Sequence, residues 1–173
     1  HTYKVGNKIG SGSYGQIRLG TNVHTNQTVE IKLEPVGSSD PQLVSENVIY
    51  RLLQGRKGFP TVYFFGRYLD YHVLVMEMLG KNLETLFQDC GRHFTLKSVI
   101  FLTLQLLKRF ETLHECNILY RDVKPENFVL GAQTNTVHVI DFGLSKSYIN
   151  PLTGQHIAFR STNELIGTSR YMS

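Results

Sequence analysis

The spacing of hydrophobic and polar positions changes near the middle of the chain. Before Gly80, short runs of alternating or clustered apolar residues have the pattern of β-strands. These runs are residues 3–9, 16–20, 28–33, 61–65 and 72–76, with a polar loop at 22–27 and a connecting loop at 67–71. After Gly80, apolar positions recur at intervals of three and four, as on one face of a helix. The pattern therefore predicts a β-rich part, residues 1–79, followed by a helical part, residues 80–173.

Three segments have the apolar period of a helix. Residues 41–53 begin with Pro41, a residue favoured at helix starts, and their expected apolar face is Leu43, Val44, Val48 and Leu52. Residues 83–90 predict a short helix and residues 95–116 a long one. The long helix is expected to bury Val99, Leu102, Leu106, Phe110 and Leu113. Two later apolar runs, 128–130 and 137–140, are expected to pair as a hairpin.

The composition excludes several classes of protein. Hydrophobic residues make up 41% of the chain, which suffices for a core and excludes disorder over most of its length. No apolar run reaches the ~18 residues of a membrane-spanning helix, and the N-terminus has no signal-like apolar region. The net charge of +4 comes from scattered Lys and Arg, so no nucleic-acid partner is expected. Cys90 and Cys116 lack metal-ligand or redox spacing, which predicts reduced thiols in a cytosolic protein.

A glycine-rich segment follows the first strand-like run. Its sequence is Gly10-Ser11-Gly12-Ser13-Tyr14-Gly15-Gln16-Ile17. Glycines at this spacing allow backbone N–H groups to approach a phosphate. The same spacing also occurs in a plain glycine hairpin, or in a dinucleotide-binding fold, where it opens a helix. Because a strand-like run follows here, we favour a strand–loop–strand arrangement.

Lys32 lies in the strand-like run 28–33, and Glu46 lies on the helix that follows. An acid on that helix could pair with the strand lysine and direct it toward a phosphate. Both residues also have an ordinary interpretation, as a solvent-facing lysine and a solvated helix acid. The sequence leaves these two interpretations open.

The segment Tyr120-Arg121-Asp122-Val123-Lys124-Pro125-Glu126-Asn127 matches the catalytic loop of protein kinases. In that pattern Asp122 accepts the proton of the attacking hydroxyl, and Lys124 can neutralise the transferring phosphoryl group. Asn127, and Asp141 in the later motif Asp-Phe-Gly, have the places of two Mg²⁺ ligands. A single motif is weak evidence, but the glycine loop, the strand lysine and these two motifs occur together in the kinase order.

With these motifs, the whole chain resembles a eukaryotic protein kinase and specifically the casein kinase 1 family. The stretches that carry the finer resemblance are 32–34, 41–43, 80–87, 121–128, 155–157 and 165–171. Tyr120 in place of the usual His, together with 32–35 and 171–173, is most similar to the gamma branch. The resemblance implies an α+β, bilobal fold. A small lobe with an antiparallel five-stranded sheet and one helix would precede an incomplete, mainly helical large lobe.

The resemblance also implies a function. Such a kinase transfers the γ-phosphate of ATP, with Mg²⁺, to Ser or Thr of proteins with acidic or phosphorylated residues upstream of the target. Arg170 would help to hold that anion, although Asn163 stands where relatives have Lys. The resemblance further implies a cytoplasmic protein with nuclear or membrane-associated pools as alternatives. Membrane association would depend on tails absent from this chain.

The resemblance assigns nucleotide contacts as well. Beyond the glycine loop and Lys32, it implies that Ile9 and Ile17 cover the adenine and that Val129 forms the floor of its pocket. Met76 would be the gatekeeper, and residues 77–79, from Glu77 to Leu79, the hinge that hydrogen-bonds the base.

Glu30 departs from the family, which has Ala at this position. Strand side chains two residues apart share a face, so Glu30 is expected on the face of Lys32, in an apolar slot beside the adenine. Burial there would raise its pKa or cost free energy. Glu30 could instead capture Lys32 in place of Glu46, or bend outward to water.

Two main hypotheses follow from these residues. The first is an active serine/threonine kinase, because every catalytic residue type is present. The second is a catalytically impaired, kinase-like binding module or truncated isoform. Glu30 suggests it, and so does the expected lack of the later part of the large lobe. A dinucleotide-binding oxidoreductase is a third, more distant alternative. The 173 residues hold the small lobe, the catalytic loop and most of the activation segment, but not the later helices. We therefore expect a marginally stable chain in which the apolar face of residues 95–116 is partly uncovered.

Overall fold

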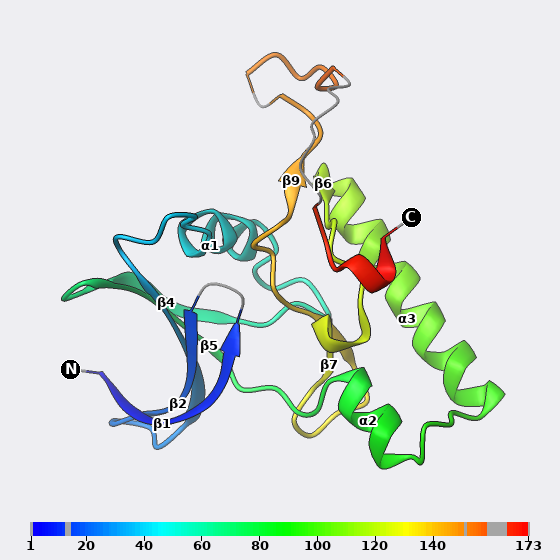
Figure 1. Ribbon diagram of the computed structural model, residues 1–173, viewed down its shortest axis with the longest axis horizontal. Helices are drawn as coiled ribbons and strands as arrows, with labels where there is room; N and C mark the ends of the chain where they lie inside the picture. The colour runs from blue at the N-terminus through cyan, green and yellow to red at the C-terminus, as the bar shows by residue number, and fades with distance from the viewer. Residues whose placement is uncertain (1, 13–14, 151, 159–165, 173) are drawn as a thin grey trace. The chain divides into compact units, whose positions relative to one another are not determined.

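The computed structural model describes residues 2–12, 15–150, 152–158 and 166–172. The chain divides into two compact units, His1–Leu79 and Gly80–Ser173 (Figure 1). Within these described ranges, the first unit consists of a sheet and one α-helix, whereas the second contains two α-helices and two short strand pairs. No helix within the described residues is both long enough and apolar enough to cross a membrane. Cys90 is exposed, Cys116 is half-buried, and both are free cysteines.

The first unit contains a five-stranded antiparallel sheet with the strand order β1-β2-β3-β5-β4. The strands are β1 (Tyr3–Gly12), β2 (Gly15–Asn22), β3 (Thr28–Pro35), β4 (Val62–Tyr68) and β5 (Tyr71–Glu77). All five strand predictions are confirmed, and each observed strand is longer than predicted. The loop predicted over 67–71 is wrong, because β4 and β5 stay paired as far as Tyr68 opposite Tyr71. Only a two-residue turn remains between these strands.

The side chains of β3 alternate between the two faces of this sheet, as a pleated strand requires. One face contributes to a cluster of buried apolar side chains, which consists of Val29, Ile31, Val73 and Val75. The other face carries three charged residues in succession, Glu30, Lys32 and Glu34. The expectation that Glu30 and Lys32 share a face is therefore confirmed.

Helix α1 (Leu43–Leu52) buries a different face from the one predicted. Leu43 is buried, but the other expected core positions, Val44, Val48 and Leu52, are 44%, 63% and 54% exposed. The buried positions are instead Leu43, Glu46 and Tyr50. The helix is oriented by polar bonds from β3, described below, rather than by its most hydrophobic stripe, so the prediction from apolar spacing was wrong.

The second unit begins with two helices that start at side-chain caps. Asn82 accepts the N–H of Thr85 before α2 (Leu83–Asp89), and Thr95 accepts the N–H of Ser98 before α3 (Leu96–Glu115). The short strands are β6 (Ile118–Leu119), β7 (Phe128–Leu130), β8 (Val137–Val139) and β9 (Lys146–Ser147). The predicted hairpin is formed by β7 and β8, while β6 pairs with β9 (Figure 1). The short 3-10 helices are η1 (Pro125–Asn127) and η2 (Ser169–Tyr171).

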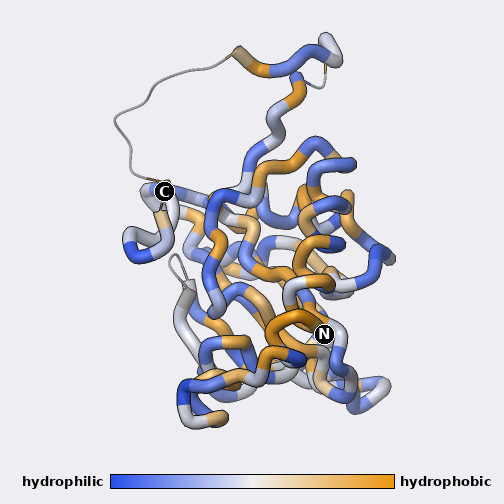
Figure 2. Tube along the Cα trace, turned by 90° about the vertical axis from the view of Figure 1, so that its right-hand side faces the viewer, coloured by the Kyte–Doolittle hydropathy of each residue, from blue (hydrophilic) through white to orange (hydrophobic). Residues whose placement is uncertain are grey.

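Helix α3 has the predicted apolar face and a second, exposed one. On the predicted face Leu113 is buried and Leu102, Leu106 and Phe110 are half-buried, but Val99 is exposed. A second stripe consists of Leu96, Ile100, Leu104 and Leu107, which are 75%, 50%, 61% and 61% exposed. Hydrophobic and hydrophilic positions alternate along much of the chain in Figure 2, as expected for elements with one buried side. An exposed apolar stripe of this kind favours association.

Replacing both Leu104 and Leu107 by Gln is expected to reduce self-association of this chain without lowering its melting temperature. Both side chains are mostly exposed, and Gln keeps a good helix propensity. Light scattering at matched concentrations, with melting followed by circular dichroism, measures both effects. Leu113→Ala is the matched control, because truncating this buried side chain should cost about 2–5 kcal/mol. Unchanged scattering in the double variant would contradict the prediction.

Candidate active site

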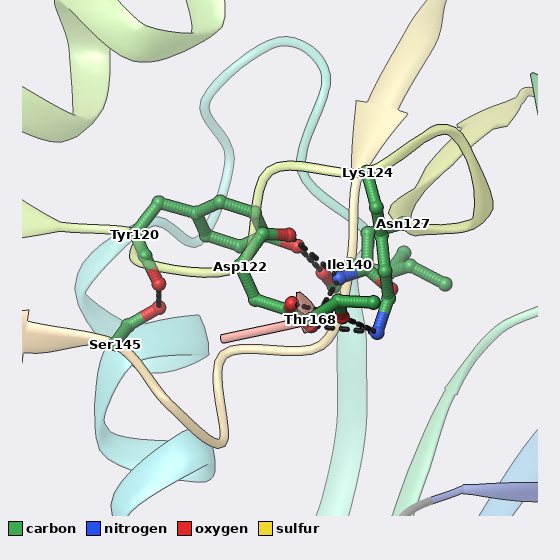
Figure 3. A network of polar contacts seen from close by, with 7 residues as sticks. All are labelled: Tyr120, Asp122, Lys124, Asn127, Ile140, Ser145 and Thr168. Carbon is green, nitrogen blue, oxygen red and sulfur yellow. Dashed lines mark hydrogen bonds and ion pairs between the residues drawn. The ribbon is translucent and has the colours of Figure 1, made fainter. Parts of the chain in front are cut away.

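The segment between β6 and β7 holds the predicted catalytic residues in a tightly turned loop. Arg121 has a positive φ of 67°, and Pro125 starts the 3-10 helix η1 that ends at Asn127. The buried Tyr120 donates its hydroxyl to the carbonyl oxygen of Ile140 at 2.5 Å. Ser145 in turn donates its hydroxyl to the carbonyl oxygen of Tyr120 at 3.0 Å (Figure 3). These bonds tie the loop to the chain on both sides of the Asp-Phe-Gly motif.

Asp122 lies at the centre of a polar network (Figure 3). Its carboxylate is 6% exposed. One oxygen, Oδ2, is 2.7 Å from Lys124 Nζ and accepts the side-chain amide of Asn127 at 2.9 Å. The other oxygen, Oδ1, accepts the hydroxyl of Thr168 at 2.7 Å, and Lys124 Nζ also donates to that hydroxyl at 3.1 Å. The structure thus brings Asp122, Lys124 and Asn127 into direct contact.

The network decides the charge of Asp122. Burial by itself would raise the pKa of this carboxyl, but hydrogen bonds from Lys124, Thr168 and Asn127 together hold the pKa below its usual 3.8. Asp122 is therefore ionised at neutral pH. It presents a fixed carboxylate that can accept a hydrogen bond, and then a proton, from a hydroxyl group.

The two predicted metal ligands lie at the same end of the β7–β8 hairpin. Asn127 immediately precedes β7, Asp141 follows β8 by two residues, and the N–H of Ile140 donates to the carbonyl oxygen of Asn127 at 3.1 Å. The side-chain amide nitrogen of Asn127 is used twice, by the carbonyl oxygen and by Oδ2 of Asp122. The amide oxygen of Asn127 is thus the atom left for a cation.

Lys32 and Glu46 form an ion pair between β3 and α1. Lys32 Nζ is 2.6 Å from Glu46 Oε2, and the two side chains are 15% and 1% exposed. The interpretation of these residues as a solvent-facing lysine and a solvated helix acid is therefore wrong. A buried acid is compatible with a core when a cation lies beside it and compensates its charge.

Glu30 lies on the same face of β3 as this ion pair. Its neighbours across the sheet are Leu19 of β2 and Met76 of β5, and its side chain is half-buried. Burial raises the pKa of Glu30 above its ordinary 4.5, Lys32 opposes that shift, and Glu46 adds to it. The expected rise in pKa is therefore confirmed, whereas the capture of Lys32 away from Glu46 is not observed.

The glycine-rich segment is an antiparallel hairpin between β1 and β2. Gly10 pairs with Ile17, Ser11 with Gln16 and Gly12 with Gly15, whereas Ser13 and Tyr14 lie outside the described residues. The strand–loop–strand prediction is thus confirmed. A dinucleotide-binding loop would open a helix, so that alternative is excluded here.

Residues 3–173 match the protein kinase domain. The chain belongs to the protein kinase family. This match confirms the kinase resemblance and the α+β fold class, and it explains the order of the glycine loop, Lys32, the catalytic loop and the Asp-Phe-Gly motif. Protein kinases use ATP as phosphoryl donor. The match covers protein kinases in general, so the casein kinase 1 resemblance stays a prediction.

The oxygen donors of this kinase suit Mg²⁺. Among the described residues there is no group of three or more His, Cys, Asp or Glu side chains that could hold a metal ion by itself. Mg²⁺ in phosphoryl-transfer enzymes needs only one or two protein carboxylates, because phosphate oxygens and waters complete its shell. The carboxylate of Asp141 and the amide oxygen of Asn127 fit that requirement.

Gly10 and Gly15, the first and last glycines of the glycine-rich segment, differ in how much room a side chain would have. A Cβ added to Gly15 would lie 2.1 Å from the carbonyl oxygen of Leu33 on β3, so no other residue fits there. A Cβ added to Gly10 would meet nothing closer than 3.7 Å, at Ile17. The sheet therefore requires Gly15, whereas a Cβ at Gly10 would make only an ordinary van der Waals contact with Ile17.

Gly15→Ala is expected to lower the melting temperature of this kinase by several degrees, because the new Cβ clashes with β3. Gly10→Ala is expected to melt like the unchanged chain, because its Cβ makes no clash, but to gain less stability from ATP with Mg²⁺, because a side chain hinders the close approach of this backbone to a phosphate. Melting curves with and without the nucleotide measure both effects. Identical behaviour of the two variants would contradict the assignment.

The remaining predicted nucleotide contacts are distributed over both units. In the first unit Ile9 is 47% exposed, Met76 and Leu79 are buried, and Gln16 and Ile17 are half-buried. Glu77 exchanges two bonds with Thr61, accepting its N–H at 3.1 Å with the carboxylate and donating its own N–H at 2.9 Å. In the second unit Val129 is buried in β7, opposite His138. Their contacts with a nucleotide remain predictions.

Arg170 lies in η2 with an exposed side chain, and its guanidinium is 5.7 Å from the centre of the Tyr171 ring. Asn163, the position where relatives have Lys, lies outside the described residues. The anion-binding role of Arg170 remains a prediction.

Two residues of the site were not predicted as functional. Thr168 donates a hydrogen bond to Asp122, which lies 46 positions earlier in the sequence. A local residue pattern does not predict a contact between residues so far apart. Glu34 accepts two backbone N–H groups at the start of α1. Its alternation with Lys32 along β3 was the one available signal, because it placed both side chains on the same face.

Proposed function

We propose that this protein kinase is a serine/threonine kinase of the casein kinase 1 type, closest to the gamma branch. The observation that carries phosphate transfer is the Asp122 carboxylate, buried, ionised and held by Lys124, Asn127 and Thr168. The casein kinase 1 assignment rests on the resemblance of the sequence. Asp122 would orient the substrate hydroxyl and accept its proton as the oxygen bonds to the γ-phosphorus and the bond to the β-phosphate oxygen breaks. Lys124 lies beside that carboxylate, where it would also neutralise the transferring group.

The other predicted site residues have supporting roles in this proposal. Lys32, held by Glu46, would contact the ATP phosphates, and the glycine loop would cover them. Asn127 and Asp141 would hold Mg²⁺, which neutralises charge on the phosphates when bound. Ile9, Ile17, Met76, the hinge residues 77–79 and Val129 would contact the adenine.

The substrate class and location in this proposal rest on the resemblance. Substrates would carry acidic or phosphorylated residues upstream of the target, consistent with the net charge of +4 and with Arg170 as an anion contact. The protein would act in the cytoplasm on other proteins and not on nucleic acid. Membrane association would need tails outside this sequence.

Phosphate transfer from labelled ATP to casein tests this function. We expect Mg²⁺-dependent incorporation by the unchanged chain and only background incorporation by Asp122→Asn. A peptide with phosphoserine upstream of the target should be a better substrate than the same peptide without it, and Arg170→Ala should narrow that difference. Equal incorporation of labelled phosphate by the unchanged chain and by Asp122→Asn would contradict the proposal.

A second candidate function is a kinase-like binding module with impaired catalysis. Glu30 supports it, because a half-buried acid with a raised pKa lies beside the Lys32–Glu46 pair, where the family has a small apolar residue. Thermal-shift titration with ATP and Mg²⁺ separates the candidates. Clear Mg²⁺-dependent stabilisation would argue for the nucleotide-binding kinase, and no shift would favour the impaired module.

A further inference from the structure

Glu34 is a buried carboxylate without an assigned role in phosphate transfer. It lies near the end of β3 and is 2% exposed. Its Oε1 accepts the backbone N–H of Gln42 at 2.9 Å, and its Oε2 accepts the backbone N–H of Leu43 at 3.1 Å. Both carboxylate oxygens therefore bond the first residues of α1.

These bonds replace a cap that the helix lacks in its own sequence. Gln42 occupies the N-cap position, and its side chain makes no capping bond to the residues that the structure describes. The first N–H groups of a helix need acceptors, and the positive end of the helix dipole favours a negative charge. Glu34 supplies both the hydrogen-bond acceptors and the negative charge from a neighbouring strand, so the start of α1 is bonded to the sheet.

The same strand holds α1 at a second point. Glu34 and Lys32 are two residues apart and share a face of β3, and Lys32 pairs with Glu46 at 2.6 Å. On the helix, Leu43 and Glu46 are three residues apart and so lie on one side. Two charged residues on one face of β3 thus bind one turn of α1. Because Glu34 holds the start of the helix, it limits where Glu46 can lie.

We propose that Glu34 is a positioning residue: its carboxylate fixes the first turn of α1 so that Glu46 stays paired with Lys32. This inference rests on the proposed function, in which the Lys32–Glu46 pair serves ATP. Without the cap, α1 visits positions in which Glu46 does not reach Lys32. The apparent affinity for ATP then falls by the fraction of molecules that keep the pair.

The test compares KM for ATP and kcat in the unchanged chain, Glu34→Gln, Glu46→Gln and the double variant. Glu34→Gln keeps the size of the side chain but offers an N–H group to one of the two backbone donors. We expect KM for ATP to rise about fivefold to tenfold, with a smaller change in kcat. The double variant should be no worse than Glu46→Gln alone, because both changes break the same pair.

Asp40→Asn is the matched control. It removes a negative charge close to the same helix start, but Asp40 is exposed and bonds the side chain of Gln42 rather than a backbone N–H. Its KM for ATP should stay within about twofold of the unchanged value. Glu34→Asp, which keeps the charge but shortens the reach, is a milder second variant in case Glu34→Gln does not fold. It should raise KM about twofold to threefold, and this effect should vanish in the Glu46→Gln background.

The outcomes separate this inference from the proposed function. If the unchanged chain is active but the effects of Glu34→Gln and Glu46→Gln on KM multiply in the double variant, Glu34 acts independently of the Lys32–Glu46 pair and the inference is overturned. The same holds if Asp40→Asn raises KM as much as Glu34→Gln does. If the unchanged chain neither transfers phosphate nor binds ATP with Mg²⁺, the proposed function fails and the inference fails with it.

Discussion

Replacing Asp122 by Asn is expected to lower kcat for phosphate transfer by about 10²–10⁴-fold, because the proton acceptor is lost while the shape of the side chain is kept. Binding of ATP with Mg²⁺ should persist, since the Lys32–Glu46 pair lies on other elements. Incorporation of labelled phosphate into casein measures the first effect, and the nucleotide-dependent melting shift measures the second. Asp70→Asn, the same change at a 95% exposed side chain, should leave kcat unaltered.

The lowered pKa of Asp122 adds a pH dependence to this prediction. A carboxyl whose pKa is depressed by folding contributes stability above its unfolded value of 3.8, and that contribution is lost as the pH falls through the lower folded value. Asp122→Asn should therefore reduce the free energy of unfolding at pH 7, and this loss should shrink as the pH falls below 3.8. Denaturant unfolding at several pH values tests the sign. A loss that grows toward acidic pH would show that the three hydrogen bonds do not stabilise the charged carboxylate.

Replacing Glu30 by Gln is expected to raise the free energy of unfolding at neutral pH by about 1–3 kcal/mol, because a half-buried charge is removed from the sheet face. The sign follows from the raised pKa. Folding favours the protonated form, so that stabilisation is complete below pH 4.5 and is lost as the pH rises through the folded value. The gain from Gln should thus appear above pH 4.5 and be absent below it. A gain of equal size at pH 4 and pH 7 would refute the electrostatic explanation.

The same position tests the two functional hypotheses. Glu30→Ala restores the residue type of the family, and we expect the melting shift with ATP and Mg²⁺ to increase, because the negative charge beside Lys32 is removed. Glu111→Gln, at an exposed acid of α3, is the control and should leave the shift unchanged. If Glu30→Ala binds no better than the unchanged chain, Glu30 does not impair nucleotide binding.

Local patterns were sufficient to predict most elements of this kinase. Period-two alternation predicted β3 and the shared face of Glu30 and Lys32, because the pleat of a strand fixes the direction of each side chain. The spacing of the catalytic-loop motif predicted the cluster of Asp122, Lys124 and Asn127, because these residues are only five positions apart and a short turn brings them together.

Apolar spacing was insufficient for α1. Val44, Val48 and Leu52 form the more hydrophobic stripe, yet they are exposed, because Glu34 and Lys32 bind the other side of the helix. Burying a paired acid such as Glu46 is compatible with a core when its charge is compensated. A hydrophobic pattern does not record that compensation.

The sequence by itself determined the order of the elements, the chemistry of the catalytic loop and the membership in the protein kinase family. Only the tertiary structure decided which partners each polar group has. Thr168 reaches Asp122 across 46 residues, Glu34 caps a helix that starts nine positions after it, and Gly15 is required by a carbonyl oxygen on another strand. Each of these contacts depends on how the backbone brings distant segments within hydrogen-bond or van der Waals distance. A local residue pattern does not contain that information.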